Sequence, residues 1–284
     1  MKNFCAIIVL STLAFPMQSF ADAKLPTLLG DIDSLTPSVY QKRQRPEPTA
    51  LREVLKLGDH RAALLDLVKS DFRSVVWREP GVDMEARIVA LREASYIALG
   101  EWGGPGVQAF LISELQGDSL TDSAERALLK ALGSLTLDTE TQRLLVNRLG
   151  DLGSSPKVRF ETLMALMNQG GFIASDAYQR ELALGKLTPL ELTRLGAQWV
   201  ISDALATKTL PREIWTQVVK HAATVSESRF AAEALWRAIG SLPAAQRKVA
   251  LELVNMEAHN DVKRSIERRQ RWAEKRSARV TPLP

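Results

Sequence analysis

Two stretches of the chain, AERALLKALGSL at positions 124–135 and AAEALWRAIGSL at positions 231–242, are near-copies of each other. Seven of the twelve positions are identical, and the second copy begins 107 residues after the first. This offset is about three periods of the mid-thirties length that is typical of helix-pair repeats. Repeats of this kind stack into solenoids, in which each unit contacts its neighbours. The duplication therefore predicts a helical-repeat architecture.

Weaker copies lie between and before the two strong ones. The tripeptide Ala-Leu-Gly at 98–100 precedes the same tripeptide at 131–133 by 33 residues, and Ala-Leu-Met at 165–167 follows it by 34. The remaining copy is expected near residues 200–202, where the match is poor. A Gln-Arg pair opens the segment after several copies, at positions 142–143, 179–180 and 246–247. Each unit is therefore predicted to hold two helices.

The spacing of apolar residues within the units is helical. In the first near-copy the apolar residues recur at steps of three and four, which places them on one stripe of a helix. No stretch of the chain sustains the period-two alternation of a half-buried strand. The sequence thus predicts an all-α fold with essentially no sheet.

Helix boundaries are predicted from glycine, proline and short polar residues. Glycine reaches the left-handed conformation that ends many helices, so Gly100, Gly133 and Gly240 are predicted helix ends. Asp122 or Ser123 is the expected N-cap of the helix that carries the first near-copy. Proline suits the first turn of a helix, because its missing N–H would lack a partner there. Helix starts are accordingly predicted at Pro156, Pro189, Pro211 and Pro243.

These features resemble the HEAT-like (HEAT/armadillo-type) α-helical repeats over residues 84–260. The resemblance rests on residues 98–100, 131–133, 165–166 and 238–240, each with its paired second helix. It implies a right-handed α-solenoid of stacked antiparallel helix pairs. In such stacks the second helices line a concave face that commonly engages protein partners. Gly170-Gly171 and the degenerate copy at 200–202 interrupt the period.

Residues 1–21 are predicted to be a secretory signal peptide that is cleaved after Ala21. Lys2 supplies a positive start, residues 6–15 are apolar, and Ser19 and Ala21 are small residues at the cleavage site. A membrane anchor is the weaker interpretation, because Pro16 interrupts a run that is short for a span. Cys5 is the only cysteine and would leave with the signal. A secreted chain without disulfides favours a bacterial periplasm.

The rest of the chain is predicted to fall into four parts. Residues 22–49 form an irregular Pro-rich linker, 50–83 a leading helix pair with a connection, 84–260 the repeats, and 261–284 a basic C-terminal cap helix and tail. Val262, Ile266 and Trp272 are the expected seat of the cap helix. Its basic residues either solubilise the end of the stack or make a weak contact with anionic lipid or lipopolysaccharide headgroups. The formal net charge of +4 gives no general case for nucleic acid.

The sequence contains no recognisable catalytic motif. The three histidines, at positions 60, 221 and 259, include no His-Glu-x-x-His pair, and Glu257, His259 and Asp261 alternate instead of sharing a helix face. No nucleophile elbow and no glycine-rich phosphate loop occurs. We therefore expect no enzyme activity, no metal and no cofactor. The alternative is a binder or degrader of an envelope polymer such as peptidoglycan glycan strands.

The expected function is that of a periplasmic scaffold which binds a protein partner, in a setting such as cell-envelope assembly. The partner site is predicted on the second helices, because the resemblance places those helices on the concave face. Trp215 is the expected anchor, since exposed aromatic residues dominate many interfaces. The full set of predicted partner-binding residues is Gln142, Arg143, Asn147, Tyr178, Arg180, Trp215, Lys220 and Arg247.

Overall fold

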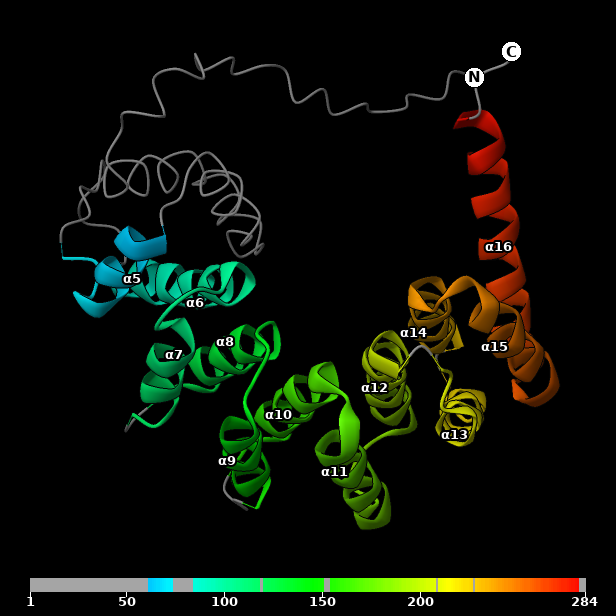
Figure 1. The fold of residues 1–284 in the computed structure, drawn as a ribbon, viewed down its shortest axis with the longest axis horizontal. Helices are drawn as coiled ribbons and strands as arrows, with labels where there is room; N and C mark the ends of the chain where they lie inside the picture. Colours follow the sequence, from blue (N-terminus) through cyan, green and yellow to red (C-terminus); the bar gives the residue numbers. More distant parts are fainter. Residues whose placement is uncertain are drawn as a thin grey trace. The chain divides into compact units, whose positions relative to one another are not determined.

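The computed structural model describes most of the chain beyond residue 60. The described residues are 61–73, 84–117, 120–150, 154–207, 209–226 and 228–280. The predicted signal peptide, the Pro-rich linker of residues 22–49, and His60 lie outside them. The described residues hold twelve α-helices and no strand, which confirms the predicted all-α class for this part of the chain (Figure 1).

The chain divides between Glu114 and Leu115 into two compact units. In the first unit, α5 (Arg61–Lys69) packs against α6 (Met84–Trp102), and α7 (Val107–Leu115) follows. The Tyr96 hydroxyl donates a hydrogen bond to Oε2 of Glu114 at 2.5 Å, and its ring lies 6.3 Å from that of Phe110. Burial and this carboxylate together raise the pKa of Tyr96.

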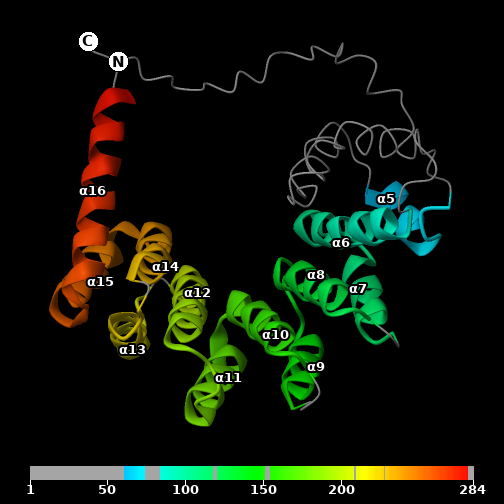
Figure 2. The same ribbon diagram turned by 180° about the vertical axis from the view of Figure 1, so that it is seen from behind.

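The second unit consists of nine consecutive described helices in two layers. In the first layer each helix packs on the next, and these first helices are α8 (Asp122–Gly133), α10 (Pro156–Gln169), α12 (Pro189–Thr207), α14 (Ser228–Ser241) and α16 (Asn260–Val280). The second helices lie between them in sequence, with α9 packed on α11 and α13 on α15. They are α9 (Thr139–Leu149), α11 (Gly171–Leu184), α13 (Arg212–Ala223) and α15 (Ala244–Glu257). The two views agree on this layering (Figures 1 and 2).

The near-copies that revealed the repeat form α8 and α14, and their apolar stripes enter the core. In α8 the buried stripe includes Ala127, Leu128 and Leu132, and in α14 it includes Leu235 and Ile239. Burying a leucine or isoleucine side chain contributes about 1.5–3 kcal/mol to folding. The stripe predicted from the spacing of apolar residues is therefore confirmed, and most of the duplicated residues are buried.

Short polar side chains begin several of these helices. Thr121 is the N-cap of α8 and accepts a hydrogen bond from the Ala124 N–H at 3.2 Å. The predicted caps Asp122 and Ser123 are wrong by one or two residues, because both already lie in the first turn. Pro156 occupies the first turn of α10 as predicted, after the Ser155 cap.

The predicted role of the Ala-Leu-Gly glycines as left-handed helix ends is wrong. Gly133 is the last residue of α8, and Gly100 and Gly240 lie inside helices; none has a positive φ. A Cβ on Gly133 would lie 3.0 Å from the Cα of Ala165, so the glycine permits α8 to approach α10 closely. The left-handed end is used elsewhere, at Gly185 after α11, where φ is 62°.

A buried ion pair and a hydrogen bond join α10 to α11 and α9. The guanidinium of Arg159 on α10 forms a two-point ion pair with Glu181 on α11, with Nε 3.0 Å from Oε2. Its Nη1 also donates to the Leu149 carbonyl at the end of α9, at 2.6 Å. Only 3% of the Glu181 side chain is exposed. One arginine therefore connects three helices.

Of the helices described, none is both long and apolar enough to cross a membrane.

Candidate functional site

The structure places the predicted anchor Trp215 in the core. Its side chain is fully buried, and its Nε1 donates a hydrogen bond to the Ala250 carbonyl at 3.1 Å. The expectation that Trp215 is exposed on the second helices is therefore wrong. The physical reason is that α13 packs on α15, and the indole fills the space between these helices. An aromatic residue in this position cannot contact a partner without unpacking the layer.

Tyr178 is also buried, so a second member of the predicted set is removed from the surface. Its hydroxyl donates to the Leu192 carbonyl at 3.3 Å, and its ring stacks on Trp199 with centroids 6.5 Å apart. Burial raises the pKa of this phenol. The aromatic part of the predicted partner site thus belongs to the packing between α11 and α12.

The other six predicted residues remain at the surface of the second helices. Gln142 is half-buried and donates from Nε2 to the Leu137 carbonyl at 3.0 Å. Arg180 pairs with Asp176 at 2.8 Å, and the Arg247 Nε donates to the Leu242 carbonyl at 2.8 Å. Arg143, Asn147 and Lys220 are exposed. Partner binding by these six residues stays a prediction.

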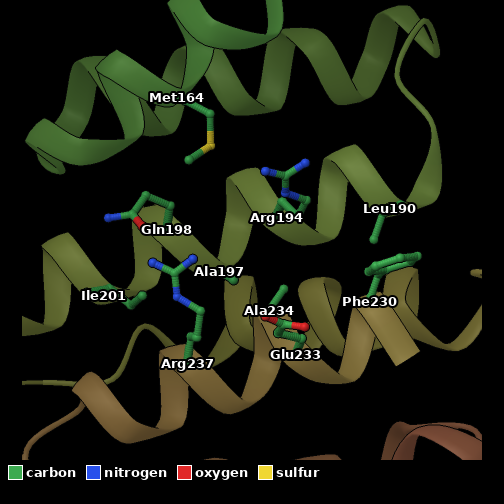
Figure 3. Close-up of a pocket in the computed structure, with 10 residues that line it drawn as sticks. All are labelled: Met164, Leu190, Arg194, Ala197, Gln198, Ile201, Phe230, Glu233, Ala234 and Arg237. Atoms are coloured by element: carbon green, nitrogen blue, oxygen red, sulfur yellow. The ribbon is translucent and has the colours of Figure 1, made fainter. Parts of the chain in front are cut away.

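A pocket of about 500 Å³ lies on the first helices, the layer that the sequence did not indicate (Figure 3). The middle helix, α12, contributes half of the lining residues, and these lie on one helix face. The neighbours α10 and α14 complete it on either side. We call this pocket the groove. It is lined by Met164 of α10, by Leu190, Arg194, Ala197, Gln198 and Ile201 of α12, and by Phe230, Glu233, Ala234 and Arg237 of α14.

Two alanines lie among larger side chains on the faces that line the groove. On α12 the lining residues follow steps of four and three from Leu190 to Ile201, so they share one face. Ala197 and Ala234 occupy positions where a larger residue would fill the hollow. The opposite face of α12 carries Leu195 and Trp199 into the core. One face of α12 therefore packs in the core, and the other face forms the shallow apolar floor of the groove.

The two ends of the groove differ in chemistry. In Figure 3, Leu190 and Phe230 lie at one end of the view and Gln198, Ile201 and Arg237 at the other. Half of the Phe230 side chain is exposed, although phenylalanine is usually a core residue. The groove therefore has an apolar end with an accessible aromatic ring and a polar end with a cation.

The electrostatics of the groove are positive. The guanidinium carbon of Arg194 lies 5.0 Å above the ring centroid of Phe160, which is a cation–π arrangement that positions the charge. Glu233 is the one acidic lining residue, and its carboxylate lies 3.5 Å from the Arg269 guanidinium of α16. Part of its charge is thus compensated, while Arg194 and Arg237 both stay exposed at the groove.

This arrangement fits an apolar side chain and a carboxylate on the same ligand. The exposed ring of Phe230 and the floor of Ala197 and Ala234 would cover the apolar group, and Arg194 or Arg237 would take the carboxylate in a two-point contact.

The histidines that the sequence analysis considered lie apart from the groove. His221 is half-buried on α13, where burial lowers its pKa. His259 is exposed, and its Nδ1 lies 3.8 Å from Oδ2 of Asp261. Within the described ranges, no three His, Cys, Asp or Glu side chains are grouped so that they could hold a metal ion.

Comparison of the chain with protein-family models, curated proteins and solved structures found no match.

Proposed function

We propose that this chain is a non-enzymatic scaffold, exported to the periplasm, which binds a segment of a protein partner in the groove formed by α10, α12 and α14. The proposal includes a right-handed HEAT-like α-solenoid of stacked antiparallel helix pairs as its architecture. Support for this architecture comes from the 107-residue duplication and from the packing of each first helix on the next. Stacked helix pairs of this kind commonly create extended binding surfaces.

The observation that carries the proposal is the exposed ring of Phe230 at the head of a basic, alanine-floored groove. Aromatic residues, phenylalanine included, and arginine are enriched at protein interfaces. Here one exposed phenylalanine and two exposed arginines line the same hollow.

The partner segment should be acidic and should carry at least one large apolar residue. Arg194 and Arg237 are complementary to carboxylates, and the arginine fork can contact a carboxylate at two points. Leu190 and Phe230 are complementary to an apolar side chain. A glycan ligand is the second candidate that the sequence left open. It would stack sugar rings on exposed tryptophans, yet no tryptophan is among the residues that line the groove, and Trp199 and Trp215 are both buried. A protein segment is therefore the better-supported ligand of the groove.

Site-specific photocrosslinking in cells tests this function. A photoreactive amino acid is placed at Phe230 in the groove, and at Met256 on α15 as a matched control, because both side chains are apolar and exposed. The proposal predicts a defined adduct from Phe230 that maps to an acidic, apolar segment of one envelope protein, and no such adduct from Met256. Equal adducts from both positions, or an adduct with glycan, would reject the protein-binding groove.

A further inference from the structure

The last helix of the described chain, α16, has two unlike faces. Val262 and Ile266 are almost fully buried, and α16 packs on α14. Arg269, one turn further on, reaches back to Glu233 of α14 at 3.5 Å. These residues are spaced by four and three and therefore share one face. The helix is seated on the repeat stack along this face, as the sequence predicted for Val262 and Ile266.

A row of four basic residues runs along another face. Arg264, Arg268, Arg271 and Lys275 are spaced by four, three and four, so they fall on a stripe about 60° wide and about 16 Å long. All four are exposed. Arg264 has a distant contact with Asp261, at 3.9 Å. Among the described residues, none offers Arg268, Arg271 or Lys275 a carboxylate within ion-pair distance. We call these four residues the basic stripe.

A solubilising cap accounts for this helix less well. A cap needs only a polar surface, and charges of mixed sign at helical spacing stabilise each other, as Asp176 and Arg180 do on α11. In the basic stripe the spacing of four brings like charges together, at Arg264 with Arg268 and at Arg271 with Lys275. Glu267, three residues after Arg264 and four before Arg271, is the acidic residue beside them, and it leaves the stripe with an excess of positive charge. Like charges at this spacing destabilise a helix. An anionic surface placed against the stripe would remove that repulsion.

Trp272 lies at the edge of the basic stripe, where it adds a second kind of contact. Its side chain is 63% exposed, which is unusual for tryptophan, whereas Val262 and Ile266 are almost completely covered. The indole group favours the boundary between the polar headgroups and the acyl chains of a bilayer. The predicted seating of Trp272 with Val262 and Ile266 is therefore wrong.

We propose that the basic stripe and Trp272 bind the surface of an anionic phospholipid bilayer, with α16 lying along it. The basic side chains would contact lipid phosphates and Trp272 would enter the headgroup layer. A bilayer is favoured over nucleic acid because a flat row of headgroups suits a straight stripe with one interfacial tryptophan. The expected export of the chain also places it beside membranes. The groove on α10, α12 and α14 plays no part in this contact.

Vesicle flotation with the full chain tests the bilayer contact. Vesicles of phosphatidylglycerol in phosphatidylcholine are compared with phosphatidylcholine alone, at 0.02 M and 0.5 M salt. We expect binding only to the anionic vesicles, and mainly at low salt, because salt screens exposed charges. The triple variant Arg268→Gln, Arg271→Gln, Lys275→Gln should bind about 100-fold more weakly, since each basic residue near an anionic surface contributes about a five-fold change in affinity.

Matched variants separate the basic stripe from general charge. The control triple Lys157→Gln, Lys186→Gln, Lys248→Gln removes the same charge from exposed residues of α10, the turn after α11, and α15, and should lose less than about five-fold. Replacing Arg268 and Arg271 by lysine should retain binding, and circular dichroism shows that each variant is folded. Equal losses in both triples, binding to neutral vesicles, or tighter binding to duplex DNA at the same salt would overturn the proposal.

Discussion

The indole Nε1 of Trp215 on α13 donates a hydrogen bond to the backbone carbonyl of Ala250 on α15, 3.1 Å away. The two residues are 35 positions apart, one repeat length, so the contact joins successive second helices. Ala250 is itself fully buried. A single side chain thus connects two repeats in the layer where the sequence indicated an exposed binding residue.

Trp215→Ala should destabilise the protein by about 3–5 kcal/mol, because it removes a fully buried ring and leaves a cavity. Urea unfolding of the full chain measures the change. Trp272→Ala is the control, since that side chain is 63% exposed, and it should change stability by less than about 0.5 kcal/mol. Unfolding midpoints that shift equally in the two variants would show that Trp215 does not fill the core.

Gly196→Ala should destabilise the protein, although alanine normally favours a helix. A Cβ at this position would lie 2.3 Å from Cγ2 of Val218 and 2.9 Å from the Tyr178 hydroxyl. Relieving this overlap should cost about 1–3 kcal/mol. Gly240→Ala is the matched control, because nothing lies within 4 Å of its added Cβ; it should stabilise by about 0.5–1 kcal/mol. Thermal unfolding measures both variants. Unfolding temperatures that shift in the same direction for Gly196→Ala and Gly240→Ala would contradict the close packing of α12.

Glu181→Gln should destabilise the protein by about 3 kcal/mol or more, because it leaves the guanidinium of Arg159 without its buried counter-charge. The control is Arg180→Ala, which removes a solvated pair with Asp176 and should cost less than about 0.5 kcal/mol. Chemical denaturation of both variants at one pH provides the comparison. If Glu181→Gln left the free energy of unfolding unchanged, the ion pair would not stabilise the packing of α10 on α11.

Stability should fall as the pH is lowered from about 7 toward 5, in part because of His221. Burial lowers the pKa of His221 below its ordinary value of 6.5. Below pH 6.5 the unfolded chain therefore binds a proton that the folded chain binds only at lower pH, and this favours unfolding. His221→Gln should flatten the dependence of the unfolding free energy on pH in this range. A His221→Gln variant whose slope equals that of the parent chain would contradict this assignment.

The repeat architecture was visible in the sequence because packing imposes a period on it. The residues shared by 124–135 and 231–242 are mainly those that enter the core, so duplication and burial coincide. One helix of the leading pair predicted within residues 50–83 is also present, as α5 from Arg61 to Lys69. The ends of the helices were predicted less accurately. Glycine at the end of an Ala-Leu-Gly run predicts a left-handed end, but at Gly133 the same residue serves close helix contact.

The candidate site was harder to predict, because a sequence period does not show which layer is exposed. Both layers carry arginines and aromatic residues, and only packing decides that Trp215 is buried while Phe230 is half exposed. One sequence feature coincides with the groove, although it was interpreted only as an interruption of the repeat. The degenerate copy expected near residues 200–202 lies on α12, where Ile201 lines the groove. A position that departs from the repeat consensus was the better indication of a site.

The most direct test of the central claim is the affinity of the groove for its partner segment. The segment that crosslinks to Phe230 is made as a peptide and titrated by calorimetry into the parent chain, Phe230→Ala and Met256→Ala. Loss of a hot-spot side chain costs about 2 kcal/mol or more, which is about 30-fold in affinity. We predict this loss for Phe230→Ala and less than a two-fold change for Met256→Ala. Unchanged binding by a folded Phe230→Ala variant would contradict the groove as the binding site.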